Sequence, residues 1–357
     1  MLTFKILQIL GFAAGGLITA LVCNTLLLRF AHSLGIRNKN DVVIRWSNES
    51  KPSLGGVSFF VVFGFAAICF SILFDEVNIF QNKQFVGLFV GGALAFAMGL
   101  ADDAYNTRPF LKLSIQILCG VLMVFTDTTI NLFHEPILDA VFTVLWVVVI
   151  MNSLNMLDNM DGITGTTVMF ILASCLFAGW MVFEFNTNIW TLLNVAVIGG
   201  VIGFLTMNIH PSKLFMGDAG SQFIGFFVAF YGVKFLWGVS ADTMSPSWLG
   251  MCIALVAFTP AAVDTLTVVI NRLKKGKSPL VGGKDHTTHH LVYAGFNDFK
   301  VWLVFLLVGF IALLLTLAMV NLVVIKAYLP VVFFPAYTIF VFILLYRNTI
   351  KYKEPER

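Results

Sequence analysis

The chain has 357 residues, of which 59% are hydrophobic and only 11% are charged. A soluble domain needs about 25% charged residues to cover its surface, so this composition excludes a water-soluble globular protein. The formal net charge of +3 gives no reason to expect nucleic acid as a partner.

Eleven apolar stretches follow one another along the chain. Runs of about 20 apolar residues match the thickness of a bilayer core when they fold as helices. No soluble domain fits between the stretches, and no internal repeat is visible. We therefore predict an all-α polytopic membrane protein with about 11 transmembrane helices, in one domain covering residues 1–357. The stretches are 6–28, 55–74, 85–101, 110–126, 137–151, 165–183, 189–207, 220–238, 248–270, 301–322 and 328–346.

Lysine and arginine residues gather in alternate loops. The odd-numbered loops and the C-terminal tail hold 18 of the 22, whereas the N-terminus and the even-numbered loops hold three. Cytoplasmic loops carry such an excess, so we predict an N-terminus outside the cytoplasm and a cytoplasmic C-terminus. Acid- and amide-rich segments occur in the same odd-numbered loops, which indicates one active site on the cytoplasmic face. These loops are 29–53, 102–112, 152–164, 208–218 and 271–300.

The third stretch ends at two adjacent acids, Asp102 and Asp103, which Asn106 and Lys112 follow. Neighbouring carboxylates repel, so a cation is expected beside them unless one of them takes up a proton. Lys112 stands near the start of the next stretch, where its ammonium could bind a phosphate as a point charge. The alternative is a solvated turn with a lysine that extends to the interface.

The fifth stretch leads into NSLNMLDNMDG at 152–162. If its helix continues, Asn155, Asp158, Asn159 and Gly162 lie on one face, because residues three and four apart are neighbours. Carboxylate and amide oxygens grouped in this way suit Mg²⁺, which keeps waters and bridges to phosphates. The alternative is a helix C-cap followed by a turn, which leaves most of these acids and amides unexplained.

Two further acids are candidates. Asp218 lies among glycines in FMGDAGS, where backbone N–H groups can approach a phosphate, and a helix starting near Ser221 would present its positive end there. Asn208 adds a polar group to the same loop. Asp264 lies within the ninth stretch. Because an acid inside a membrane is costly, Asp264 is expected to line a polar site or to lie near the cytoplasmic end.

Three of the six histidines, His286, His289 and His290, stand close together. The spacing of His286 and His290 is compatible with zinc, but no Cys or His spacing supplies further ligands. Several lysines in the same loop indicate an anionic ligand, such as a phosphate or sugar phosphate. The positive-inside rule alone would explain the lysines but not the histidines.

With these residues in view, the chain resembles the polyprenyl-phosphate N-acetylhexosamine-1-phosphate transferases. Their superfamily also contains the phospho-N-acetylmuramoyl-pentapeptide transferases of peptidoglycan synthesis. The resemblance covers most of the chain in the family's order. It rests on KPSLGG (51–56), GLADDAYNTRPFLKLSIQ (99–116), NSLNMLDNMDG (152–162), NIHPSKLFMGDAGS (208–221), DTL (264–266) and the terminal histidine block.

The resemblance implies transfer of a sugar 1-phosphate from a UDP-sugar to undecaprenyl phosphate, with release of UMP. The reaction would take place at the cytoplasmic face of a bacterial inner membrane, in a protein that is a monomer or a homodimer. Mg²⁺, with Mn²⁺ as the alternative, would be held by Asp218 and Asn155, and Asp102 and Asp103 would be catalytic. The implied substrate-binding residues are Lys51, Asn106, Lys112, Asp158, Asp161, Asn208, Asp264, His286, His289 and His290.

Two departures from the family pattern concern the sugar. Asn159 occupies a position where a glycine is usual, and DHTTHH replaces the usual His-x-His-His. A GlcNAc or related donor that starts a cell-surface glycan, such as teichoic acid or lipopolysaccharide, is favoured. The alternative is the peptide-bearing donor of peptidoglycan synthesis, for which the chain has neither a triple-histidine run nor an extra cytoplasmic segment.

The sequence leaves two questions open, namely the mechanism of the transfer and the functional class of the protein. Direct attack by the lipid phosphate is favoured over a covalent aspartyl phosphate, because most phosphoryl transfer relies on positioning and electrostatics. A secondary transporter is the alternative of another class. Transporters place their polar residues near the bilayer midplane, whereas the acids here gather at one face.

Overall fold

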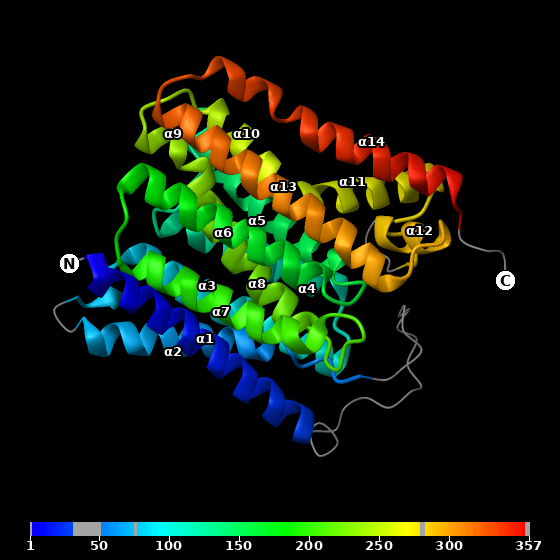
Figure 1. The fold of residues 1–357 in the computed structure, drawn as a ribbon, viewed down its shortest axis with the longest axis horizontal. Coiled ribbons are helices and arrows are strands. Elements are labelled where there is room, and N and C mark those ends of the chain that lie inside the picture. Colours follow the sequence, from blue (N-terminus) through cyan, green and yellow to red (C-terminus); the bar gives the residue numbers. More distant parts are fainter. Residues whose placement is uncertain (1, 31–50, 75–76, 279–282, 354–357) are drawn as a thin grey trace.

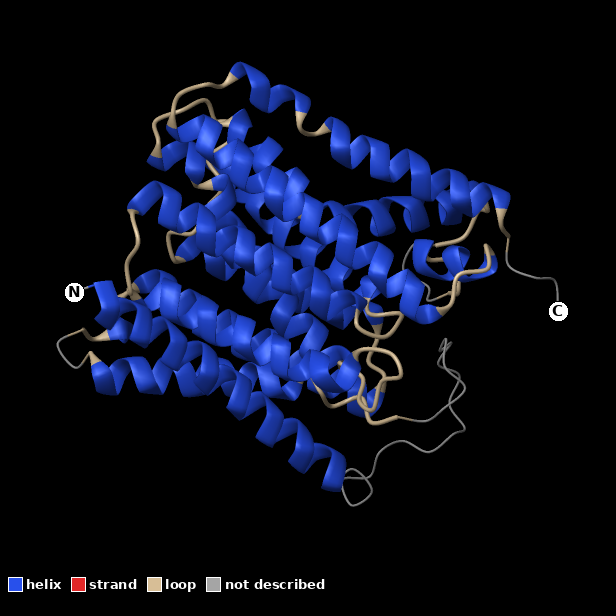
Figure 2. Cartoon of the chain, in the orientation of Figure 1, coloured by secondary structure: helices blue, strands red, loops and turns tan. Residues whose placement is uncertain are grey.

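The computed structural model describes residues 2–30, 51–74, 77–278 and 283–353 (Figure 1). Within these ranges the regular elements are helices, and no strand is present (Figure 2). The α-helices are α1 (Leu2–Phe30), α2 (Val57–Leu73), α3 (Lys83–Tyr105), α4 (Pro109–Phe125), α5 (Pro136–Leu157), α6 (Ile163–Phe183), α7 (Ile189–Asn208), α8 (Gly217–Gly232), α9 (Val239–Asp242), α10 (Trp248–Ala257), α11 (Thr259–Lys274), α12 (Thr287–Tyr293), α13 (Asp298–Val324) and α14 (Ala336–Lys351). The short elements are η1 (Ile79–Gln81), η2 (Val233–Trp237) and η3 (Leu329–Phe333), of which η2 is π-helical.

Each of the eleven apolar stretches falls on helix, so the predicted all-α polytopic architecture is confirmed. Among the described residues, eight helices are long and apolar enough to cross a membrane, or nine if one bent pair is a single span. Helices α2 and α4 are apolar but shorter, with 17 residues each. The predicted number of crossings and the predicted orientation stay predictions.

The ninth stretch is not one straight span. Helices α10 and α11 meet at Phe258 and are bent by 82°. Pro260 stands in the first turn of α11. Because proline lacks an N–H and its ring clashes with the preceding turn, it prevents α10 from continuing as one helix. Asp264 therefore lies in α11 beyond the bend, in contact with the start of α12.

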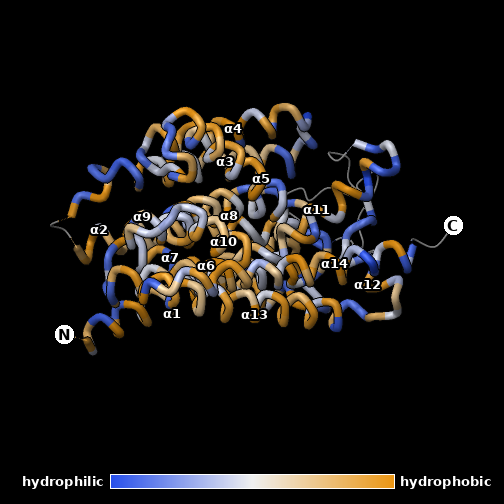
Figure 3. Tube along the Cα trace, turned by 90° about the horizontal axis from the view of Figure 1, so that it is seen from above, coloured by the Kyte–Doolittle hydropathy of each residue, from blue (hydrophilic) through white to orange (hydrophobic). Residues whose placement is uncertain are grey.

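The long helices run side by side, and the two chain ends lie at opposite ends of the bundle (Figure 1). The predicted odd number of crossings would produce such a placement. Hydrophobic residues cover the middle of long helices such as α1 and α13, and hydrophilic segments lie toward their ends (Figure 3). Such a surface is unfavourable in water and matches the hydrocarbon core of a bilayer.

Helix α8 lies at the centre, buried from Ala219 to Gly232 and packed against α3 and α5. Its first turn touches the backbone just before α2. A Cβ atom on Gly56 would lie 2.0 Å from Cα of Gly220, and a Cβ on Gly220 would lie 2.4 Å from Cα of Gly56. Gly56 N–H also donates to the carbonyl of Met216 at 2.8 Å. This glycine contact fixes the start of α8, which carries Asp218.

Candidate active site

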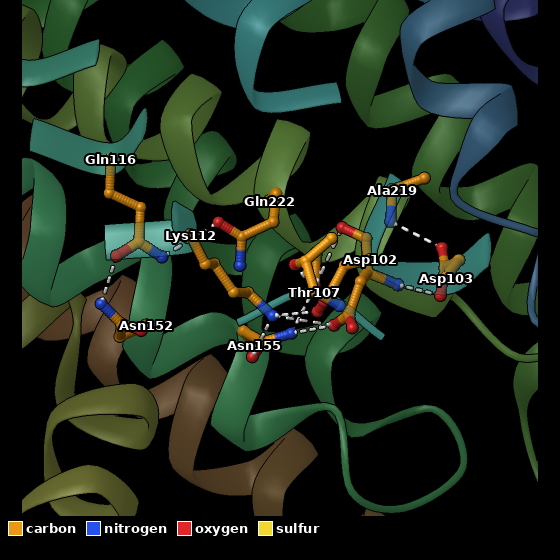
Figure 4. A network of polar contacts seen from close by, with 11 residues as sticks. Asp102, Asp103, Thr107, Lys112, Gln116, Asn152, Asn155, Ala219 and Gln222 are labelled. Carbon is orange, nitrogen blue, oxygen red and sulfur yellow. Dashed lines mark hydrogen bonds and ion pairs between the residues drawn. The ribbon is translucent and has the colours of Figure 1, made fainter. Parts of the chain in front are cut away.

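Four helix ends bring predicted site residues together (Figure 4). Helices α3 and α5 finish at this end of the bundle, whereas α4 and α8 begin there. Asp102 and Asp103 stand in the last turn of α3, and Asn155 stands in the last turn of α5. Lys112 and Asp218 belong to the first turns of α4 and α8. Alternating helix directions therefore assemble residues that are far apart in sequence.

Lys112 lies at the centre of this group. Its Nζ is 3.0 Å from Asp102 Oδ2, 3.4 Å from Asp218 Oδ1 and 3.3 Å from Asn155 Oδ1. Only 16% of its side chain is exposed, so these charges interact more strongly than they would in open water. A solvated turn with an extended lysine is therefore the wrong description of this segment.

Asp102 and Asp103 have different partners although they are adjacent. Asp102 Oδ1 accepts from the backbone N–H and the hydroxyl of Thr107, at 2.8 and 2.6 Å. Asp103 accepts from the N–H groups of Asp218 and Ala219, at 2.9 and 2.8 Å. Asp103 thus occupies the positive end of α8. The phosphate site expected at that helix end is taken, in part, by this carboxylate.

The predicted metal pair is in direct contact. Asn155 Nδ2 donates to Asp218 Oδ1, and it also donates to Ser221 Oγ at 2.8 Å. Lys112 brings one positive charge to the carboxyl groups of Asp102, Asp103 and Asp218, so it can neutralise at most one of them. A divalent cation would be favourable in such a place.

The helix does not continue beyond Leu157, contrary to the one-face expectation for Asn155, Asp158, Asn159 and Gly162. Helix α5 ends at Leu157, Asp158 is its C-cap, and Gly162 has φ of 77°. Glycine adopts this left-handed conformation without steric cost, and the Asp- and Asn-rich turn before it supports the chain reversal. Asn159 consequently points elsewhere, and its Oδ1 accepts from Thr288 Oγ1 of α12 at 2.6 Å.

The charges of the cluster nevertheless act on Asp158. Burial, followed by the negative charges of Asp218 and Asp103, raises the pKa of Asp158 to about 8. No three His, Cys, Asp or Glu side chains in the described ranges are arranged to hold a metal by themselves. Proteins often bind Mg²⁺ through one or two carboxylates plus substrate phosphates. The pair of Asp218 and Asn155 could supply protein ligands to such an ion, and the substrate phosphate would supply others.

The histidine block is anchored by Asp264, whose side chain is fully buried. Asp264 Oδ2 lies 2.8 Å from His286 Nδ1, and its Oδ1 accepts from Thr287 N–H at 2.9 Å and from Thr287 Oγ1 at 2.6 Å. The rings of His286 and His289 pack edge to face, 5.4 Å apart. Burial, with the nearby His286, lowers the pKa of His289 to about 3, so His289 is neutral at pH 7.

The loop before α12 and the chain end after α14 hold this block in place. Asp285 forms a two-point ion pair with Arg272, at 2.7 and 2.8 Å. Burial alone would raise the pKa of Asp285, but hydrogen bonds and charge from Arg272 outweigh it and lower that pKa. His290 Nδ1 contacts the carbonyl of Tyr352. The block is therefore fixed from α11, from the turn after α5 and from the C-terminal segment.

Asp161 and Lys51 lie in a third group, built on the loop after α7. Asp161 accepts from Ser212 N–H at 3.1 Å and from Ser212 Oγ at 2.8 Å, and it contacts His210 Nδ1 at 3.2 Å. Lys51 Nζ donates to Ser212 Oγ at 3.5 Å. The rest of loop 29–53, apart from its two ends, lies outside the described residues.

Asn208 binds backbone groups with its side chain, and Asn106 caps a helix. Asn208 Oδ1 accepts from Gly162 N–H at 3.0 Å, and its Nδ2 donates to the carbonyl of Leu214 at 2.8 Å. Asn106 is exposed and forms the left-handed C-cap of α3. The Asn208 side chain thus connects the turn after α5 with the loop after α7, whereas Asn106 ends α3.

Sequence analysis missed three amides that lie beside the charged cluster (Figure 4). Gln116, Asn152 and Gln222 form a connected hydrogen-bonded group. The sequence spacing could have identified them, because each stands three or four residues from Lys112, Asn155 or Asp218 on the same helix. Residues at that spacing share a helix face.

The model of the glycosyl transferase family 4 matches residues 85–236. The chain is also 26% identical over 329 residues to a probable undecaprenyl-phosphate N-acetylglucosaminyl 1-phosphate transferase of Bacillus subtilis, covering 87% of this chain and 85% of that protein. The chain is therefore similar to glycosyl transferase family 4 over its central part. The matched range contains the whole Lys112 cluster, whereas Asp264 and the histidines follow it.

Two other proteins similar to this chain have related names. A decaprenyl-phosphate N-acetylglucosaminephosphotransferase of Mycolicibacterium smegmatis is 28% identical over 291 residues, covering 74% of this chain and 71% of that protein. A phospho-N-acetylmuramoyl-pentapeptide-transferase of Streptococcus suis is 28% identical over 326 residues, covering 81% and 90%. The resemblance inferred from the motifs is confirmed, including its link to the peptidoglycan branch.

Proposed function

We propose that this protein transfers GlcNAc 1-phosphate from UDP-GlcNAc to undecaprenyl phosphate and releases UMP. The observation that carries the proposal is Lys112, held between Asp102, Asp218 and Asn155 where four helices meet at one end of the bundle. A cluster at the membrane edge can reach both a lipid phosphate and a water-soluble nucleotide. The names of the relatives in Bacillus and Mycolicibacterium support the same reaction.

The reaction joins two anions. An oxygen of the lipid phosphate attacks the phosphorus that carries the sugar, a new P–O bond forms, and the bond to UMP breaks. Because a phosphate oxygen is already nucleophilic, the protein must mainly position the anions and offset their charge. The Lys112 ammonium, fixed by three partners, provides such charge without having to reorganise during the reaction.

Asp218 and Asn155 would hold the Mg²⁺, or Mn²⁺ in its place. The bound ion supplies charge neutralisation and Lewis-acid polarisation of a phosphoryl oxygen. Asp102 keeps Lys112 oriented, and Asp103 keeps the first turn of α8 in position so that Asp218 faces Asn155.

Direct attack is favoured over an aspartyl phosphate. Both oxygens of Asp103 accept hydrogen bonds from backbone N–H groups. Those of Asp102 are shared between Thr107 and Lys112. A carboxylate nucleophile needs an accessible lone pair directed at phosphorus, and these contacts oppose that role.

The block of His286, His289 and His290 would cover the nucleotide side of the site. Thr288, which belongs to the same short helix, contacts Asn159 in the turn after α5. This contact supports a role for the block next to the Asp158 turn, where the pyrophosphate or the sugar would lie. Sugar choice would then depend on the two places where this chain departs from the family pattern.

The test is UMP release by purified protein with undecaprenyl phosphate and a panel of UDP-sugars, including UDP-MurNAc-pentapeptide. We expect release with UDP-GlcNAc, loss of activity with EDTA and recovery with Mg²⁺. Asp218→Ala should reduce the rate at least 100-fold, as is usual for loss of an essential charge-stabilising contact. Asp127→Ala is the matched control, because Asp127 is an exposed acid beyond the other end of α4.

Two other outcomes of this assay would lead to different conclusions. Release only with the peptide-bearing donor would assign the chain to the peptidoglycan branch. No UMP from any donor would overturn the transferase proposal, and transport in proteoliposomes would be measured next.

A further inference from the structure

A second polar layer lies one helical turn beyond the charged cluster. Its members are amides on three of the four helices that form the cluster, and each stands three or four residues further from the helix end than a charged or metal-binding partner. Four residues of helix correspond to a rise of about 6 Å. The layer consists of Gln116 on α4, Asn152 on α5 and Gln222 on α8.

These amides form a chain of hydrogen bonds with one direction. Asn152 Nδ2 donates to Gln116 Oε1 at 2.7 Å, and Gln116 Nε2 donates to Gln222 Oε1 at 3.0 Å. Asn152 Nδ2 also donates to the carbonyl of Val148 at 2.8 Å. Because the carbonyl of Val148 can only accept, it must face the Asn152 nitrogen, and this sets the orientation of the two glutamines that follow. The chain must therefore end on the amide nitrogen of Gln222.

That nitrogen has no partner within the part of the chain that the structure describes. Gln222 is fully buried, and its Nε2 is a buried donor without a hydrogen bond. In Figure 4 this nitrogen lies on the side of the amide that faces Lys112 and Asn155. A buried donor without an acceptor costs about 1–3 kcal/mol, so the arrangement calls for an acceptor from outside the described chain.

We propose that Gln222 Nε2 donates a hydrogen bond to a phosphoryl oxygen of the substrate. The inference rests on the proposed transferase function. Lys112 brings positive charge to the same space, and phosphoryl oxygens are strong acceptors without a proton to donate. The depth of the amide layer favours the lipid phosphate, which approaches from the membrane side, over the nucleotide, which arrives from water. Gln222 would then help select a phosphate held at the membrane edge.

The experiment compares Gln222→Met with Gln116→Met. The first variant removes the free donor. The second breaks the amide chain but leaves the Gln222 amide in place, so it controls for lost packing and hydrogen bonding. UMP release is measured with undecaprenyl phosphate varied at saturating UDP-sugar, and then with UDP-sugar varied at saturating lipid. Thermal unfolding of each variant is recorded in the same detergent.

We expect Gln222→Met to raise the KM for the lipid phosphate about tenfold, equivalent to about 1.4 kcal/mol. Gln116→Met should lower thermal stability and change both KM values less than twofold. A rise confined to the KM for UDP-sugar would support the donor and assign its acceptor to the nucleotide. If Gln222→Met proves unstable, Gln222→Glu keeps the acceptor for Gln116, replaces the donor and should raise the same KM.

Two results would overturn the inference. Unchanged KM values in Gln222→Met would mean that a water satisfies the donor. Equal kinetic changes in Gln222→Met and Gln116→Met would reduce the layer to a packing element. Both require an active wild-type protein, whereas a wild-type protein that releases no UMP would instead overturn the proposed function.

Discussion

Charged residues in this protein differ in what surrounds them, and that difference determines what each of them can do. Lys112 is held by three polar partners in a mostly buried position. Lys83, by contrast, pairs with Asp127 on an open surface, where 75% and 69% of the two side chains are exposed. In the first arrangement the charges interact strongly enough to act on a bound substrate. An exposed pair contributes little to the free energy of folding.

The ion pair of Asp285 and Arg272 gives a pH-dependent prediction. Because Arg272 lowers the pKa of Asp285 below its ordinary value of 3.8, the folded state favours the ionised carboxylate. The resulting stability is present above pH 3.8 and is lost as the pH falls through the lowered pKa. We expect Asp285→Asn to destabilise the protein by about 3 kcal/mol at pH 7, because it leaves a buried guanidinium without its carboxylate.

Thermal unfolding of purified protein between pH 7 and pH 3 measures this effect. The difference between wild type and Asp285→Asn should shrink at the acidic end of the range. Asp127→Asn is the control and should have almost no effect at any pH. A loss of the same size at every pH would contradict the role of ionised Asp285.

At the scale of helices, the site depends on where four helices end and on one very close backbone contact. Asp218 reaches Asn155 only because the start of α8 is held by Asp103 and by the contact of Gly56 with Gly220. There is no space for a methyl group between these two glycines. The position of α8 is therefore coupled directly to the geometry of the Lys112 cluster.

Gly220→Ala tests this coupling. The added Cβ would push α8 away from the backbone at Gly56, with a cost of about 1–3 kcal/mol. We expect a lower unfolding temperature and at least a tenfold drop in UMP release. Gly64→Ala is the matched control, since no atom lies within 4 Å of the new Cβ in α2. Gly220→Ala with normal activity would show that the glycine contact does not position the site.

The sequence predicted these helices well but not their ends or partners. Long apolar runs identify helices because backbone groups in a bilayer must bond internally. The break at Phe258 was missed because the apolar pattern runs through it, although Pro260 signalled it. The end of α5 at Leu157 was missed because spacing alone cannot show where a helix stops.

At the scale of the whole molecule, described residues of several odd-numbered loops contact one another, as Lys51 and Asp161 do with Ser212 and Asn159 does with Thr288. Motif order and charge bias predicted that these loops form one site, and that grouping stays a prediction. They could not predict that Asn208 would be used by the backbone at Gly162 and Leu214. Nor could they show that Asp264 would bind the histidine block. Such pairings arise from three-dimensional packing between residues that are distant in the chain.

The predicted orientation can be measured with single cysteines. In a background where the native cysteines are replaced by alanine, Lys83→Cys should react with a membrane-impermeant maleimide in intact cells. Lys275→Cys should react only after the membrane is permeabilised. Both lysines are exposed in the structure, so lack of space does not limit labelling. The reverse pattern would place the Lys112 cluster outside the cytoplasm.

The position of the site in the chain also affects how it is made. The Lys112 cluster is complete once α8 has been synthesised, whereas α12 with its histidines follows only after α9, α10 and α11. Ribosomes add about 5–20 residues per second, so the two halves of the site are separated by several seconds of translation. During this time the nascent acids and Lys112 already meet beside the lipid, and the contacts of α8 with α3 and α5 must hold them together until the last helices dock.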